Sequence, residues 1–291
     1  MGRMPNPITT LQAAQALQDR AQCVHTPAGA GTLVWRVWGQ GRPTVLLHGG
    51  SGSWNHWVRN IDALLASGRQ VIAPDLPGFG DSARPDDVTD ADGQAPLLEQ
   101  GLQRLLGATA VDAVGFSFGA LTGGLWAAAQ PARFARLVLV GAPALSLERI
   151  APLPLRLWER YEPGPARDAI HRHNLRTLML AHDASVDELA VALHAANLPR
   201  DRLRRRQLML TDLLVRTLPA LRCPVAGIWG EHDVLYVSRH QVVRDALTLA
   251  PHSLGVQFVA EAGHWVQYER ADAFNQALQR ALDAPLPGPA A

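Results

Sequence analysis

Val111-Asp-Ala-Val-Gly-Phe-Ser-Phe-Gly-Ala120 is the stretch of sequence that decides the fold. Its apolar first half predicts a buried strand, and the small residues around and after Gly-x-Ser-x-Gly predict a sharp turn into a helix. Glycine at positions 115 and 119 suits a turn so tight that a side chain would meet the neighbouring strand or helix. Such a unit holds a serine hydroxyl clear of its own backbone, so Ser117 is the predicted nucleophile.

Length and composition fit one large α/β domain with an inserted segment. The chain has 291 residues, 47% of them hydrophobic and 18% charged, which is typical of a globular protein. A net charge of +1 argues against a general binder of polyanions. All basic residues apart from histidine are arginine, which excludes Schiff-base chemistry on a lysine. Cys23 and Cys223 are isolated and predicted to be reduced, although a disulfide between them is left open.

The sequence also sets expectations about location and partners. Met1 to Thr10 is polar and proline-rich, and no run of ~18 apolar residues occurs, so we expect a cytoplasmic protein without a signal peptide or membrane span. A small-molecule substrate is the expected partner. We expect no nucleic acid, membrane, cofactor or metal, and a homodimer is left open.

Apolar runs that alternate with helical segments predict a mostly parallel sheet with helices on both faces. Helices are expected at 11–22 and 54–67 among others. The segment 145–219 shows a helical pattern with several proline breaks, and it predicts an inserted, all-helical cap. Residues 1–144 and 220–291 would then form the two parts of the core. The predicted strands are Leu33–Trp38, Thr44–His48, Gln70–Pro74, the strand from Val111, Arg136–Gly141, Pro224–Gly230 and Val256–Val259.

Two late strands end at residue types that complete a catalytic triad with Ser117. Asp233 follows the strand that ends at Gly230, and His264 follows the last strand. Because the carboxyl ends of parallel strands meet at one edge of a sheet, we expect these side chains to lie together. His264 would take the serine proton, and Asp233 would orient the imidazole. Glu231 and Asp245 are the alternatives for the acid.

A glycine-rich loop follows the strand that ends at His48. Backbone N–H groups of such a loop can approach a substrate oxygen closely and form an oxyanion hole. The N–H of Phe118, next to the nucleophile, is the first predicted donor, and Gly50 or, as alternative, Ser51 the second. Asp75 lies in a later turn-rich loop, where we expect it to accept backbone hydrogen bonds.

Two clusters of basic side chains are expected to have no catalytic role. His-x-His cannot share a helix face, and no cysteine or carboxylate set completes a metal site, so the cap histidines are expected to be solvated or to pack in the cap. The arginine run is expected on a solvated helix face, with a carboxylate-binding patch as alternative. The residues concerned are His171, His173 and His182, and Arg202, Arg204, Arg205 and Arg206.

Together these motifs resemble the α/β-hydrolase superfamily over nearly the whole chain. Two stretches, His48-Gly-Gly-Ser-Gly-Ser-Trp-Asn-His-Trp57 and Gly263-His-Trp-Val-Gln-Tyr-Glu-Arg-Ala-Asp-Ala-Phe-Asn275, are similar to the meta-cleavage-product hydrolases. That family cleaves carbon–carbon bonds in vinylogous 1,5-diketones. The resemblance implies a Ser–Asp–His hydrolase, with Trp265, Asn55 and Gly49 as candidate substrate-binding residues.

The resemblance leaves two alternatives open. The family carries a cap arginine that grips the substrate carboxylate, whereas this chain has Leu193-His194 in that region. A plain carboxylester is therefore an alternative to the diketone. A ligand-binding protein of the same fold without turnover is the alternative to an enzyme.

Overall fold

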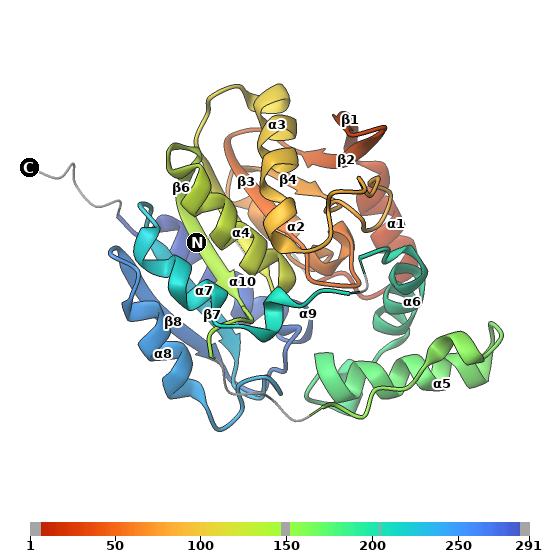
Figure 1. The fold of residues 1–291 in the computed structure, drawn as a ribbon. Helices are drawn as coiled ribbons and strands as arrows, with labels where there is room; N and C mark the ends of the chain where they lie inside the picture. The colour runs from red at the N-terminus through yellow and green to blue at the C-terminus, as the bar shows by residue number, and fades with distance from the viewer. Residues whose placement is uncertain (1–6, 147–151, 204, 286–291) are drawn as a thin grey trace, which may run out of the picture.

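The computed structural model describes residues 7–146, 152–203 and 205–285 and shows one twisted, eight-stranded sheet with helices around it (Figure 1). The strand order is β1-β2-β4-β3-β5-β6-β7-β8. β1 pairs antiparallel with β2, and β2 pairs antiparallel with β4, whereas the remaining neighbours are parallel. The strands are β1 (Gln22–Ala28), β2 (Gly31–Trp38), β3 (Arg42–Leu47), β4 (Arg69–Pro74), β5 (Val111–Phe116), β6 (Phe134–Val140), β7 (Val225–Gly230) and β8 (Ser253–Val259).

Helices cover both faces of the sheet, which explains why the central strands are apolar at nearly every position. Successive residues of a strand point to opposite faces, so Leu137 and Val138 of β6 enter two different hydrophobic clusters. α3 (Ala95–Leu106), α4 (Phe118–Ala129) and α8 (His240–Thr248) contribute buried residues to the first cluster. α1 (Leu11–Asp19), α2 (Ile61–Ala66) and α10 (Ala271–Asp283) contribute to the second. α9 (Val266–Glu269) is a single turn before α10.

Two predicted helices are wrong in extent. The helix expected at 11–22 ends at Asp19, because Gln22 already begins β1, an edge strand that the sequence pattern did not indicate. The helix expected at 54–67 is interrupted: a 3-10 turn, η1 (Trp54–Trp57), is separate from α2. Long-range bonds explain this break, since the Trp54 N–H donates to Asp75 and the Asn60 amide donates to the Gln267 carbonyl.

Between β6 and β7, the residues that the structure describes form helices and loops and no strand. α5 (Pro165–Asn174) and α6 (Glu188–Asn197) lie side by side at one end of the sheet, with a π-helical turn, η5 (Leu175–Met179), after α5 (Figure 1). α7 (Leu213–Thr217) instead packs against α4 and joins the first cluster through Leu214. A cap with the limits 145–219 stays a prediction. Across the described residues, no helix has both the length and the apolar character needed to cross a membrane.

A buried carboxylate anchors β5 at the end opposite Ser117. Asp112 is fully buried and accepts hydrogen bonds from Arg42 at 2.8 Å and from Arg69 at 2.7 Å, and an Arg136 nitrogen lies 3.6 Å away. Arg69 and Arg136 are themselves buried. Removal of this carboxylate would take the counter-charge from the buried Arg136 and leave the buried Arg69 only the exposed Asp283 at 3.4 Å. Such a loss costs far more than the loss of a surface ion pair.

We therefore expect Asp112→Ala to lower the free energy of unfolding by roughly 3–5 kcal/mol, measured by urea denaturation at pH 7.5. Asp62→Ala is the matched control, because Asp62 pairs with the half-exposed Arg20 at the surface. That variant should lose less than about 1 kcal/mol. Equal losses in the two variants would contradict the assigned role of Asp112.

Candidate active site

Ser117 sits at the turn between β5 and α4 in the left-handed region of backbone space, with φ 50° and ψ −116°. Two close approaches hold this turn. A Cβ on Gly115 would lie 2.4 Å from the Gly119 oxygen, and a Cβ on Gly119 would lie 2.4 Å from the Leu47 oxygen. Real Cβ atoms are not found so close to backbone oxygens, so both positions require glycine. The serine side chain is thereby directed away from the sheet and α4.

The fold brings together the three side chains that the sequence singles out. His264 Nε2 lies 3.0 Å from Ser117 Oγ, and His264 Nδ1 lies 2.9 Å from Asp233 Oδ2. All three are buried. Since an ionised carboxylate accepts hydrogen bonds, Nδ1 carries the proton and Nε2 is left to accept from the serine hydroxyl. This arrangement can transfer a proton from Ser117 to His264.

The alternative acids lie elsewhere. Glu231 and Asp245 are both exposed, and Asp245 accepts a hydrogen bond from Gln241 on the outside of α8. Asp233 also accepts the backbone N–H of Leu235 at 3.0 Å, which fixes its carboxylate toward the imidazole. Asp75 accepts backbone hydrogen bonds, as expected. Its side chain is buried and accepts the N–H groups of Trp54 and Asp81.

The predicted oxyanion-hole residues surround Ser117. Gly50, Ser51 and Phe118 all line the cavity into which the serine opens, a space of about 200 Å³. As the first residue of α4, Phe118 has no intrahelical acceptor for its N–H. Ser51 has a left-handed backbone, φ 52°, and its hydroxyl donates to Asp201 at 2.6 Å.

The three candidate substrate-binding residues do not belong to the described lining of this cavity. The Asn55 side chain exchanges hydrogen bonds with the Asn197 amide at the contact with α6. The buried Trp265 stacks on Tyr268 and donates to the His56 carbonyl. Gly49 packs against the Phe116 ring. The structure therefore gives all three a packing environment next to the cavity wall, and their direct contact with substrate stays a prediction.

His56 and His194 line the cavity instead, and sequence reasoning gave neither of them a site role. His56 is buried, and its Nδ1 accepts the N–H of Gly49 at 3.2 Å. Burial, with smaller contributions from His48 and His194, holds the pKa of His56 well below its usual value. Burial also lowers the pKa of His194 to about 3, and its Nε2 has no hydrogen-bond partner among the described residues. The cavity wall thus presents neutral imidazoles at pH 7.

Arg206 brings a guanidinium group to the same cavity. It lies over the rings of Phe79 and Phe118 and is held by the Asp201 carboxylate at 2.9 Å. The expected helix face for the arginine run is wrong, because the described residues from 201 to 207 form no helix; the Asp90 carboxylate accepts the N–H of Gln207 there. Arg202 and Arg205 are exposed, and Arg204 lies outside the described residues.

A carboxylate that the sequence did not indicate joins the cap segment to the catalytic loop. The nearly buried Glu269 accepts the N–H of Gly263 at 2.6 Å and the N–H groups of Ala181 and His182, both at 2.9 Å. The backbone N–H of Trp265 also donates to the carbonyl of Met179 in η5 at 2.7 Å. The loop that carries His264 is therefore bonded directly to the segment after η5.

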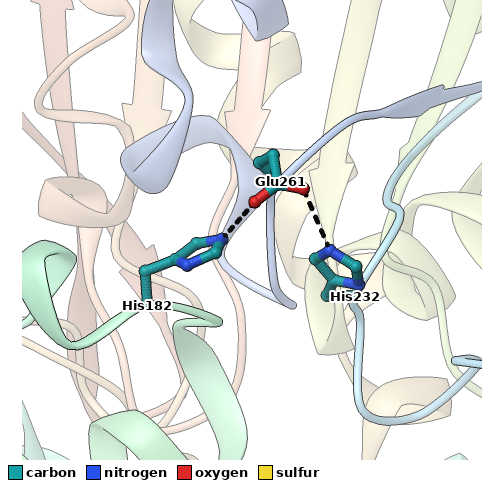
Figure 2. A group of neighbouring side chains, drawn as sticks. All are labelled: His182, His232 and Glu261. Carbon is teal, nitrogen blue, oxygen red and sulfur yellow. Dashed lines mark ion pairs between the residues drawn. The ribbon is translucent and has the colours of Figure 1, made fainter.

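The expectation that no metal site forms with the cap histidines stays a prediction, although the structure places a carboxylate beside one of them. His182 lies beside His232 and Glu261, which come from loops distant in sequence (Figure 2). His171 is buried against His194, and His173 bonds the Pro154 carbonyl, so these two pack within the cap as expected.

Comparison with known proteins identifies the fold family that the chain matches. Residues 43–271 match the sequence model of a family described as alpha/beta hydrolase fold. The chain is 28% identical over 259 residues to 2-hydroxy-6-oxo-6-phenylhexa-2,4-dienoate hydrolase of Burkholderia cepacia, covering 82% of this chain and 86% of that protein. It is also 28% identical over 268 residues to 2-hydroxy-6-oxononadienedioate/2-hydroxy-6-oxononatrienedioate hydrolase of Escherichia coli. This match covers 85% of this chain and 89% of that protein. The resemblance seen in the sequence is confirmed.

Solved structures share the architecture. A carboxylesterase from Bacillus subtilis matches with a TM-score of 0.74 at 19% identity, over 94% of this chain and 97% of that one. A thermophilic esterase from Thermogutta terrifontis matches with a TM-score of 0.70 at 23% identity, over 90% of this chain and 98% of that one. At these identities the likeness shows the fold alone, and the predicted fold class is confirmed.

The neutral His194 predicts a specific dependence of stability on pH. Its folded pKa of about 3 lies below the ordinary 6.5, so the unfolded chain binds the proton more tightly. The neutral His194 therefore contributes to the free energy of unfolding in full above pH 6.5, and this contribution is lost as the pH falls from 6.5 toward 3. Between pH 7.5 and 5, wild type should lose about 2 kcal/mol more unfolding free energy than His194→Gln, measured by urea denaturation. His25→Gln, at an exposed site, is the control and should follow wild type; identical losses in all three would refute the prediction.

Proposed function

The chain belongs to the α/β hydrolase fold family and is a hydrolase, and we propose that it acts through a Ser117–His264–Asp233 triad on a small, largely apolar carbonyl substrate. The observation that supports this proposal most is the continuous relay of contacts, 3.0 Å from Ser117 to His264 and 2.9 Å from His264 to Asp233. These three side chains meet at the cavity, and in this arrangement a proton can pass from Ser117 to His264 without rearrangement.

In the proposed mechanism, Ser117 Oγ attacks the substrate carbonyl while its proton passes to His264 Nε2. Asp233 stabilises the imidazolium through Nδ1. Collapse of the tetrahedral intermediate gives an acyl-enzyme as His264 returns the proton to the leaving group. A water molecule, deprotonated by His264, then attacks the acyl carbon and releases the acid and the free serine.

The negative oxygen of the intermediate would be stabilised by backbone donors. The Phe118 N–H begins α4, so the positive end of the helix dipole adds to its hydrogen bond. The backbone N–H of Gly50 is the proposed second donor, with that of Ser51 as alternative, because both residues line the same cavity as Ser117. The closed surroundings strengthen both interactions by excluding water.

The cavity favours a substrate with apolar groups on at least one side of its carbonyl. Leu178, Met179 and Leu198 are among its apolar lining residues. A larger hollow of about 590 Å³ adjoins it and shares Met209 and Leu235 with it. Together they offer space for both an acyl group and a leaving group.

Two substrate classes fit this site. The curated relatives are named for dienoate substrates, which supports a carbon–carbon bond hydrolase acting on a meta-cleavage-type diketone acid. In that case His264 would first assist ketonisation of the dienol. A neutral carboxylester is favoured by Arg206, whose charge is already paired with Asp201, and by the uncharged His194 in the cavity wall.

The proposal includes the location and partners expected from the sequence. Cys23 and Cys223 are both free thiols, which suits the proposed reducing cytoplasm. The proposed partner is a small-molecule substrate, with neither nucleic acid nor a membrane involved. A homodimer is left open.

We expect Ser117→Ala to abolish hydrolysis of short p-nitrophenyl esters and labelling by a fluorophosphonate probe, with an unchanged thermal melting curve. Asp233→Asn should keep the geometry yet lower kcat about 10⁴-fold, because the imidazole would hold its proton on the wrong nitrogen. Asp245→Asn, on the exposed side of α8, is the matched control and should retain full activity. Tight ligand binding without labelling of wild type would instead favour a non-catalytic binding protein.

A substrate panel separates the two classes. Hydrolysis of a 2-hydroxy-6-oxo-dienoate, followed by the loss of its visible absorbance, is compared with hydrolysis of neutral esters of similar size. If Arg206 remains neutralised by Asp201, kcat/KM should be higher for the ester, and Asp201→Asn should shift preference toward the anionic substrate by freeing the guanidinium charge. A dienoate preference in wild type would assign the carbon–carbon bond reaction.

A further inference from the structure

Three side chains of metal-binding type meet outside the triad (Figure 2). His182 follows η5, His232 follows β7 and Glu261 follows β8. His182 Nε2 lies 3.1 Å from Glu261 Oε2, and His232 Nε2 lies 3.5 Å from Glu261 Oε1. Both imidazole rings turn a nitrogen toward the carboxylate (Figure 2), and one ligand atom from each residue lies within 4.8 Å of the others.

These separations suit a shared cation. Two ligand atoms that are each about 2.1 Å from a tetrahedral ion lie roughly 3.4 Å apart. The two histidine–carboxylate distances, one to each oxygen of Glu261, are of this size. His182 Nε2 is shielded from solvent yet makes no hydrogen bond, although the carboxylate oxygen is near. The nitrogen thus points toward the carboxylate without the geometry of a hydrogen bond, and imidazole nitrogens are common metal ligands.

The backbone holds each of the three residues in place. The His182 N–H donates to the Glu269 carboxylate at 2.9 Å, and the His232 N–H donates to the Ala262 carbonyl at 2.8 Å. The Glu261 carbonyl accepts a hydrogen bond from Arg270 at 2.8 Å. Glu261 also has a left-handed backbone, φ 56°, a conformation that is uncommon for a residue with a long side chain. The ligand set is thus largely preorganised.

We propose that His182, His232 and Glu261 bind one first-row divalent cation, with Zn²⁺ as the best match. Two imidazoles and one carboxylate are a ligand set that Zn²⁺ accepts, with water as the fourth ligand. Ca²⁺ and Mg²⁺ are disfavoured because they prefer oxygen ligands. The partly exposed side chains leave access for the ion and for the water ligand.

The ion would fasten the segment after η5 to the catalytic loops. His232 is next to Asp233, and Glu261 lies three residues before His264. One cation would therefore join both loops to the segment that Glu269 already contacts. Its role is structural, and no step of hydrolysis passes through it, so it can be tested by binding alone.

The test titrates the EDTA-treated full-length protein with Zn²⁺ by calorimetry and with Co²⁺ by visible absorption. Wild type should bind one equivalent of each and show the visible bands of a four- or five-coordinate Co²⁺ site. His182→Ala, His232→Ala and Glu261→Gln should each weaken binding at least ~10-fold, because each removes one ligand. Zn²⁺ should raise the Tm of wild type and leave the Tm of these variants unchanged.

His25→Ala and His252→Ala, at exposed histidines outside the cluster, should bind the ion as wild type does. His264→Ala should lose hydrolysis but keep the one equivalent, so that failure of the proposed catalysis and failure of the metal site can be told apart. Melting curves in EDTA verify that every variant is folded. Undiminished binding in the three cluster variants, or loss of binding only in His264→Ala, would overturn the proposed site.

Discussion

The close approach of the start of α4 to the ends of β3 and β5 is the constraint on which the site depends. No side chain fits at 115 or 119, so the turn closes tightly enough to hold Ser117 in a left-handed conformation. That conformation costs free energy, which the surrounding buried strands and α4 repay by fixing the turn. The same approach places the glycine-rich loop after β3 beside the serine, so nucleophile and proposed oxyanion donors come from one packing arrangement.

The electrostatic character of the cavity follows from burial. His56 and His194 remain neutral because hydration of their charged forms is lost, and Arg206 is balanced by Asp201. In the proposed mechanism, surroundings of low dielectric would let the buried Asp233 carboxylate and the backbone donors act on the reacting atoms with little competition. A cavity of this kind suits a substrate whose charge develops mainly during the reaction.

The contact between the segment around η5 and the core combines apolar packing with polar bonds, since Leu175 and Met179 share the second hydrophobic cluster with Trp265. Glu269 accepts three backbone N–H groups from both sides of this contact, and His182, His232 and Glu261 meet at its outer edge. Removal of the Glu269 carboxylate would leave those N–H groups without acceptors. The position of His264 and the position of the segment after η5 are therefore coupled through the same few bonds.

The sequence by itself determined the sheet's central strands, the turn at Ser117 and the residues of the proposed triad. Each depends on a local pattern: continuous apolar runs, two glycines around a serine, and polar residues directly after strands. Only the tertiary structure decided the features that join distant segments. β1 forms because β2 offers it an edge, Asn55 bonds Asn197 of α6, and Arg206 reaches the cavity that Ser117 lines from an irregular segment. His182 meets His232 and Glu261 for the same reason. Such pairings are set by how loops from separate elements pack at one end of the sheet, and no periodicity along the chain encodes them.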